Sequence, residues 1–155
     1  GLKARADASS RRLYTIGTWR VSRDMYLWHL SQRGVRVLLD VRGNPKAGRQ
    51  EELHRGKELT RVLQGAGIRY EYWGDRLGEE QAEAQQDADT RRMLKGMLAA
   101  ASPGPVCFLG HMHEPHKCHR LRLSDLVPAE WEVLHLTWSD HQSVATVGHD
   151  EAREA

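Results

Sequence analysis

Short apolar runs alternate along the chain with segments whose apolar residues recur at helical spacing. Two of the runs, 35–41 and 105–110, are nearly continuous, as in central strands that are covered on both faces. Strands are predicted at 13–16, 35–41, 68–73, 105–110 and 131–138, and helices at 23–33, 58–64, 89–100 and 118–127. This alternation predicts a single three-layer α/β domain with a mostly parallel sheet of about five strands and right-handed crossovers.

Three polar segments lie outside this pattern. Residues 1–12 contain no apolar stretch of the kind that a secretory signal needs, and we expect a flexible N-terminal segment before an α/β domain at 13–138. The polar residues 74–87 are expected to form a long exposed loop or a surface helix. Residues 79–90 lie near a predicted strand end, and this position would permit them to act as a lid. Residues 139–155 are polar and aperiodic, so we expect a flexible C-terminal tail.

The composition is that of an ordinary soluble domain. The 155 residues suffice for one core, with 39% hydrophobic and 28% charged residues, and no apolar run approaches the ~20 residues of a membrane-spanning helix. Two cysteines do not make a disulfide framework, which favours a reducing, cytoplasmic setting. The net charge of +2, from 23 basic and 21 acidic residues, permits contact with nucleic acid but is far from the dense basic surface of a dedicated binder.

Two loops qualify as the place of a functional site. In a parallel sheet, ligands bind beyond the carboxyl ends of the strands, and the loops after the second and fourth predicted strands are both rich in polar residues. They comprise 42–45, with the sequence RGNP, and 110–119, with the sequence GHMHEPHKCH. We therefore expect the two loops to lie together at one edge of the sheet.

Cys118 is the candidate nucleophile. It lies at the predicted start of a helix, beside His119 and Arg120, where helix amides and neighbouring cations would stabilise a thiolate. A histidine would then be its acid–base partner. The alternative is a small residue packed under the helix start, with His119 capping the helix or solvated. Cys107, within the apolar run VCFL, is expected in the core.

The histidine-rich loop lacks the spacing of a structural metal site. Its candidate ligands are His111, His113, His116, Cys118 and His119, in the order H-x-H-x2-H-x-C-H. This order matches no zinc pattern with paired ligands on two separated arms. We expect a solvated loop that holds neither metal nor cofactor, and we assign His111 to substrate contact.

Asp40 and Arg42 supply acid–base and anion-binding groups in the first loop. A carboxylate at a strand end is a candidate general base, and Arg42, Asn44 and Arg120 are candidates for holding a phosphate or another anion. An internal pair of Asp40 and Arg42 that fixes the turn is the alternative. The glycine patterns match no phosphate-binding loop, and a C-x5-R phosphatase motif would need arginine where the chain has Ser124.

Aromatic residues border the same strand ends. The chain has five tryptophans and four tyrosines beside one phenylalanine. Tyr72 lies near the end of the third predicted strand and Trp19 follows the first, where rings could stack on a nucleic-acid base. A place in the core or at its rim is the alternative for such residues.

Four motifs resemble those of the family called domain of unknown function 488. They are YTIGT at 14–18, LLDVRGNP at 38–45, AGIRYEYWGDRLG at 66–78 and EPHKCHRLRLSDLV at 114–127, in the order of that family, and the similar part spans about residues 13 to 136. The resemblance implies an α/β domain whose candidate site positions are Asp40, Arg42, Asn44, Pro45, Cys118, His119 and Arg120. The family usually has a further cysteine where this chain has Gly110. The resemblance therefore does not extend to a two-thiol mechanism, unless Cys107 or the extra histidines substitute.

Three functions are compatible with these residues. The first, which we favour from the sequence, is a hydrolase or glycosylase-like enzyme that acts on a nucleotide or a nucleic-acid base, as in the repair or removal of modified bases. Arginine would hold phosphate, and Asp40 or a histidine would transfer protons. The second is sulfur or acyl transfer through Cys118, in keeping with the short resemblance of LLDVR to the corresponding strand of rhodaneses. The third is a non-catalytic module that binds an anion or a partner.

Overall fold

Six strands form one mixed sheet in the computed structural model, which describes residues 11–18, 22–43, 56–101, 103–111, 115, 118–139 and 143–154. The strands are β1 (Arg12–Gly17), β2 (Val37–Asp40), β3 (Arg69–Tyr72), β4 (Val106–Gly110), β5 (Glu132–Ser139) and β6 (Ser143–Gly148). Their order across the sheet is β3-β2-β4-β1-β5-β6, and every neighbouring pair is parallel except β5 and β6. The prediction of an α/β fold with a mostly parallel sheet is confirmed, with one strand more than expected.

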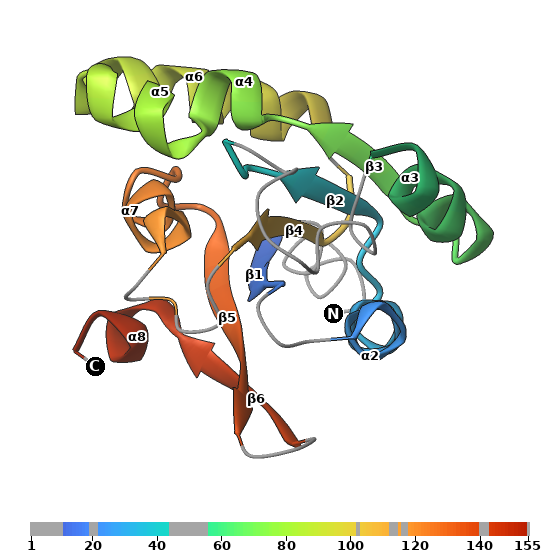
Figure 1. Ribbon diagram of the computed structural model, residues 1–155. Helices are drawn as coiled ribbons and strands as arrows, with labels where there is room; N and C mark the ends of the chain where they lie inside the picture. Colours follow the sequence, from blue (N-terminus) through green and yellow to red (C-terminus); the bar gives the residue numbers. More distant parts are fainter. Residues whose placement is uncertain are drawn as a thin grey trace.

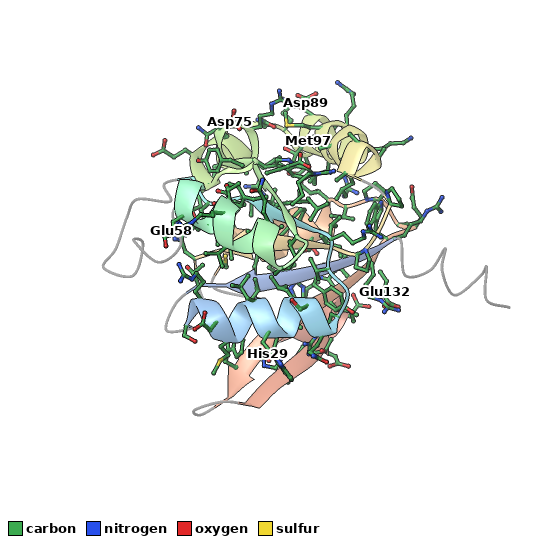
Figure 2. All side chains as sticks on the ribbon, turned by 90° about the vertical axis from the view of Figure 1, so that its right-hand side faces the viewer. His29, Glu58, Asp75, Asp89, Met97 and Glu132 are labelled. Carbon is green, nitrogen blue, oxygen red and sulfur yellow. The ribbon has the colours of Figure 1, made fainter. Side chains whose placement is uncertain are left out.

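Helices cover both faces of the sheet (Figure 1). They are α2 (Arg23–Gln32), α3 (Gly56–Gly65), α4 (Gly74–Leu77), α5 (Glu79–Ala84), α6 (Asp87–Ala101), α7 (His119–Asp125) and α8 (His149–Glu154). One hydrophobic core joins the sheet to α2 and α3 and includes Leu63, and a second joins the other face to α4, α5, α6 and α7 and includes Leu98. Figure 2 shows His29 of α2 and Met97 of α6 on opposite sides of the molecule.

Local sequence accounts for the boundaries of several elements. Ser22 caps α2, because its hydroxyl accepts a hydrogen bond of 3.2 Å from the amide of Met25. The chain leaves that helix through Gly34, whose φ of 69° favours glycine. Strands β2 and β4 are buried along their whole length, as their continuous apolar runs predict. Burial on both faces thus places these two strands in the interior of the sheet.

Two polar segments differ from the prediction. Residues 139–155 are expected to be a flexible tail, but β6 and α8 occupy most of them, and β6 pairs antiparallel with β5. The expected loop or surface helix at 74–87 consists mainly of two short helices, α4 and α5. Residues 1–10 of the expected N-terminal segment lie outside the described part of the chain. Within the described ranges, no helix has the length and the apolar content that are needed to cross a bilayer.

Candidate functional site

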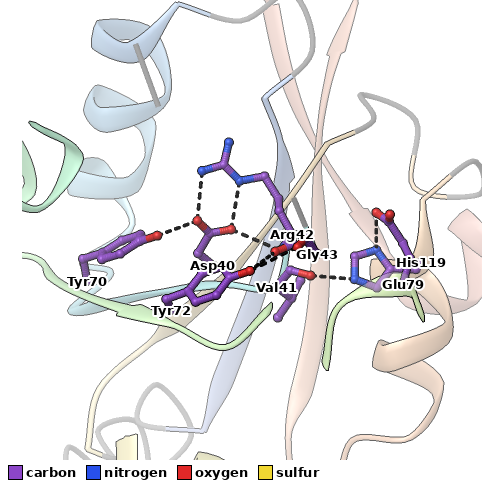
Figure 3. Close-up of polar contacts among 8 residues, drawn as sticks. All are labelled: Asp40, Val41, Arg42, Gly43, Tyr70, Tyr72, Glu79 and His119. Atoms are coloured by element: carbon purple, nitrogen blue, oxygen red, sulfur yellow. Dashed lines mark hydrogen bonds and ion pairs between the residues drawn. The ribbon is translucent and has the colours of Figure 1, made fainter. Parts of the chain in front are cut away.

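The two loops singled out in the sequence meet at one edge of the sheet. Strands β2 and β4 are neighbours, with Asp40 opposite Leu109, so that the segments leaving them start side by side. A hydrogen bond of 2.8 Å joins Nε2 of His119 to the carbonyl oxygen of Val41 (Figure 3). The segment after β2 and the start of α7 therefore belong to one site.

Asp40 and Arg42 form a fully buried ion pair. The guanidinium donates two hydrogen bonds of 2.9 Å to the two carboxylate oxygens, and the Arg42 amide donates a third of 3.1 Å. The Tyr70 hydroxyl donates a fourth, of 2.5 Å. Burial, followed by the charge of Asp40, raises the pKa of Tyr70, so this hydroxyl stays protonated as a donor. Both charged side chains have an exposed fraction of 0%, which is the arrangement of a turn-fixing pair.

This pair fixes the backbone that receives His119. The amide and the side chain of Arg42 both bond to Asp40, which closes a tight turn around Val41. Tyr72 adds a hydrogen bond of 2.9 Å from its hydroxyl to the carbonyl oxygen of Arg42. The neighbouring carbonyl of Val41 is thereby held as the acceptor for the His119 ring. Asp40 and Arg42 therefore act on the site through the position of His119.

Cys118 lies against the end of β4. The residue is 9% exposed, and a Cβ placed on Gly110 would come within 2.7 Å of the Cys118 sulfur. Glycine at this position leaves the space that the sulfur occupies. The charge of the Cys118 side chain acts on both His119 and Arg120, and Arg120 is 0% exposed. A histidine and a buried guanidinium therefore flank the thiol.

The surroundings of His119 favour its protonated form. Burial lowers the pKa of His119, but the hydrogen bond and charge of Cys118, the Glu79 carboxylate and the Val41 carbonyl raise it, with a net shift upward. Nδ1 of His119 lies 3.4 Å from Oε1 of Glu79 (Figure 3). Because Nε2 donates to the Val41 carbonyl, Nδ1 is the nitrogen that is available to exchange a proton.

A cavity of about 560 Å³ adjoins the thiol. It is lined by Glu79, Ala82, Glu83, His111, Cys118, His119 and Arg122. Three of these residues belong to α5, which lies within the segment 79–90 considered as a lid from the sequence. This helix forms one wall of the cavity. An ion pair of 3.2 Å between Arg122 and Asp87 connects α7 to the start of α6. Burial, followed by the charge of Arg42, lowers the pKa of His111, which favours the neutral form of this ring.

The expected anion-binding and stacking residues do not line this cavity. Arg42 and Arg120 are both buried, the first paired with Asp40 and the second packed with Cys118 against Gly110. Tyr72 is 39% exposed and lines a separate cavity of about 310 Å³, formed by β3, α4 and α6. The structure therefore brings Cys118 and His119 together at one cavity, with His111, and sets Tyr72 apart from them.

Several expectations for the two loops cannot be placed. The residues concerned lie outside the described part of the chain, namely Asn44, Pro45, Trp19, His113 and His116. In the segments that the structure describes, no group of three or more His, Cys, Asp or Glu side chains is arranged to hold a metal ion.

Three charged residues that line the cavity were not assigned from the sequence, namely Glu79, Glu83 and Arg122. The two glutamates are four residues apart, which is the spacing of one helix face, within the segment GEEQAEA. Arg122 likewise lies four residues after Cys118. Helical spacing is therefore the signal that could have found these residues.

Substitution of Gly110 by alanine tests the packing of the thiol. The added Cβ would lie 2.7 Å from the Cys118 sulfur and 3.3 Å from Cδ of Arg120, so both side chains must move. Since both side chains are buried, we expect a loss of about 1 to 3 kcal/mol in the free energy of unfolding. Alkylation of Cys118 should slow about tenfold, because the sulfur is displaced from the cationic side chains beside it.

Gly96 provides the control for this substitution. It lies within α6, and a Cβ placed there meets nothing within 4 Å. Gly96→Ala should stabilise the protein by up to about 1 kcal/mol through helix propensity and leave alkylation unchanged. Denaturant unfolding and the alkylation rate measure both variants, and equal rates in the two would contradict the close packing of Cys118 against Gly110.

Neither the scan against family models nor the searches among curated proteins and solved structures found a match to this chain. The resemblance to the domain of unknown function 488 family therefore rests on the four sequence motifs alone. The chemistry of the site has to follow from its own side chains.

Proposed function

We propose that this protein is an enzyme that transfers a sulfur or acyl group through Cys118. The observation that carries the proposal is the position of Cys118 at the wall of a cavity that His119 also lines, with the side chain of Arg120 packed beside the same end of β4. Reactive cysteines lie in electropositive, partly exposed surroundings, whereas structural cysteines are buried and inert. Cys118, which is 9% exposed and lines a cavity with His119 and Arg122, is closer to the first kind, and Cys107, with an exposed fraction of 0%, is of the second.

Arg120 supports the thiolate form of Cys118. Burial lowers the pKa of Arg120, and the thiols of Cys118 and Cys107 counteract this effect. A guanidinium nevertheless stays charged in proteins, and a buried cation gains from an opposite charge nearby. Cys107 is a poor source of that charge, because burial raises its pKa well above the usual range of a thiol. A thiolate at Cys118 can supply it.

The proposed reaction has two transfer steps. The Cys118 thiolate attacks a carbonyl carbon or a sulfane sulfur of the donor and forms a covalent bond to it. The bond to the leaving group breaks with its electron pair on that group, and His119 donates a proton to it from Nδ1. A water, amine or thiol then attacks an acyl intermediate, or a thiol attacks the outer sulfur of a persulfide intermediate. The attacking group gives its proton to His119, and Cys118 leaves as the thiolate.

The described residues lend less support to the nucleotide hypothesis. The two arginines expected to hold phosphate are buried, and Arg42 is paired with Asp40. The cavity next to Cys118 instead presents the carboxylates of Glu79 and Glu83 beside Arg122. Two carboxylates at this place repel a polyanion, and nucleic-acid binding depends on neutralising phosphates with cations.

Alkylation of the thiols at a series of pH values tests the proposal. We expect Cys118 to react with iodoacetamide at pH values at which a free thiol, with a pKa of ~8.5, is mostly protonated. The His119→Gln variant lacks one stabilising cation. The pH below which its alkylation rate falls should therefore shift upward, toward that of a free thiol. Peptide mass spectrometry identifies which cysteine has been alkylated. Cys107 is the internal control, since its burial should prevent alkylation in the folded protein.

Transfer is measured separately from reactivity. Mixed with an activated acyl ester or with thiosulfate, the protein should gain an acyl group or a sulfur on Cys118, and the Cys118→Ser variant should gain no sulfur. The proposal is overturned if Cys118 alkylates with the pH dependence of a free thiol, or if it takes up neither group. An unreactive thiol beside an occupied cavity would point to a binding module instead.

A further inference from the structure

A chain of four hydrogen-bonded side chains, here named the relay, lies outside the lining of the Cys118 cavity. The Thr15 hydroxyl lies 2.5 Å from Nδ1 of His135. Nε2 of His135 lies 2.9 Å from Nδ1 of His149. Nε2 of His149 lies 2.6 Å from Oδ1 of Asp125. The relay joins β1, β5, α8 and the end of α7 in one continuous path.

The two ends of the relay differ in exposure and in charge. Thr15 and His135 are 0% exposed, whereas the side chains of His149 and Asp125 are 17% and 35% exposed. At the outer end, Nε of Arg153 lies 3.3 Å from the carboxylate of Asp125. At the inner end, burial, followed by the charges of Arg120 and His149, lowers the pKa of His135 to about 3. Burial therefore disfavours a proton on the inner ring, His135.

The hydrogens of the relay run in one direction when both rings are neutral. A carboxylate only accepts hydrogen bonds, so His149 must donate from Nε2 to Asp125. A neutral His149 then has no hydrogen on Nδ1, which accepts from Nε2 of His135. Nδ1 of His135 is bare in turn and accepts from the hydroxyl of Thr15. Each of the three bonds has one donor and one acceptor.

One added proton requires the opposite direction in the inner part of the relay. A protonated His149 donates from both nitrogens, so Nε2 of His135 must accept. His135 stays neutral if its hydrogen is on Nδ1, from which it donates to the oxygen of Thr15. The Thr15 hydroxyl then turns its own hydrogen away from His135. All three bonds persist, and the added charge stays on His149 beside Asp125.

We propose that the relay is a proton-binding switch, in which uptake of one proton at His149 reverses the inner hydrogen bonds and changes the tautomer of the neutral His135. The added proton comes from solvent, and the hydrogen of His135 exchanges with solvent during local opening, so the switch is an equilibrium response. Histidine is suited to this role, since its charge changes between about pH 5 and 8.

The switch carries a surface protonation event into the sheet without placing a charge there. At the inner end, the Thr15 hydroxyl changes from a donor to an acceptor toward His135, and its own hydrogen becomes available to a different group. Strand β6 and helix α8 stay attached in both states, because no bond of the relay is lost. The proposal is independent of the chemistry of Cys118.

Proton–nitrogen correlation spectra of the histidine rings, recorded at a series of pH values, test the switch, because they distinguish the two neutral tautomers from the protonated ring. We expect His135 to carry its hydrogen on Nε2 while His149 is neutral and on Nδ1 once His149 is protonated. Both changes should occur at the same pH. His29 of α2 is the control: its Nδ1 bonds to Arg33, so it should pass directly from one neutral tautomer to the protonated ring.

The His149→Gln variant removes the ring that binds the proton and keeps a side chain that can accept from His135. In this variant His135 should keep its hydrogen on Nε2 over the same pH range. The switch is excluded if wild-type His135 keeps one tautomer while His149 titrates, or if His135 itself becomes protonated in that step. A change of the His135 tautomer in the His149→Gln variant would exclude it as well.

Discussion

Replacement of Asp40 by asparagine is expected to lower the free energy of unfolding by about 3 to 5 kcal/mol. The variant keeps the guanidinium of Arg42 charged and fully buried beside a neutral amide. The carboxylate of Asp40 accepts from Arg42 on both oxygens and from the Tyr70 hydroxyl. An amide turns its N–H groups toward one of these donors, so a buried donor is left without an acceptor.

Denaturant unfolding at neutral pH measures this loss. Asp89→Asn is the matched control, because Asp89 forms an exposed ion pair of 3.4 Å with Arg92 on α6 (Figure 2). Its expected effect is below about 0.5 kcal/mol. Combining Asp40→Leu with Arg42→Met removes both buried charges and should recover much of the loss. An effect of Asp40→Asn no larger than that of Asp89→Asn would contradict the role of the pair in fixing the turn.

The same pair connects stability to the thiol. If Asp40 and Arg42 hold the Val41 carbonyl in place, their loss also releases the His119 ring. The folded fraction of the Asp40→Asn variant should then show the alkylation profile of His119→Gln, although Asp40 lines no part of the cavity next to Cys118. This distinguishes a positioning role of Asp40 from the general-base role expected from the sequence.

The central strands were predictable because a continuous apolar run fits only a segment buried on both faces. Strands β2 and β4 lie within the predicted runs at 35–41 and 105–110. The C-terminal elements have no such pattern, since β6 contains two valines and α8 has Ala152 as a buried apolar residue. Pairing of β6 with β5 and the bond of His149 to His135 hold them on the sheet. These contacts depend on tertiary structure, which local periodicity does not reveal.

The site was predictable in its place but not in its internal contacts. Parallel topology brings the ends of β2 and β4 together, and this followed from the order of strands and helices. The sequence left open whether the Asp40 carboxylate contacts a substrate or Arg42. In the structure Tyr70 of β3 donates a hydrogen bond to the carboxylate that is paired with Arg42, and this contact could not be predicted. Glu79 escaped notice because its segment has no apolar face that would predict contact with α7. Polar contacts between distant segments leave no apolar period in the sequence, and the helical spacing of the glutamates shows a shared face but not its partner.

Acidification from about pH 6.5 to about pH 4 is expected to remove about 3 kcal/mol of stability through His135. Burial, followed by the charges of Arg120 and His149, lowers the pKa of His135 from 6.5 to about 3. Between these two values, the unfolded chain binds a proton at this position and the folded chain does not. The stability that the neutral ring contributes is therefore complete above pH 6.5 and is lost progressively as the pH falls toward 3.

Comparison with the His135→Gln variant isolates this contribution, because the other histidines are shared. Glutamine can still donate to His149 but leaves the Thr15 hydroxyl without its acceptor, so we expect the variant to be about 1 to 3 kcal/mol less stable at neutral pH. The variant has no ring to protonate at this position, and the two stabilities should converge and then cross as the pH falls. Denaturant unfolding at a series of pH values measures the difference. Parallel curves would mean that the folded protein protonates His135 without penalty, and the relay would then not keep its inner ring neutral.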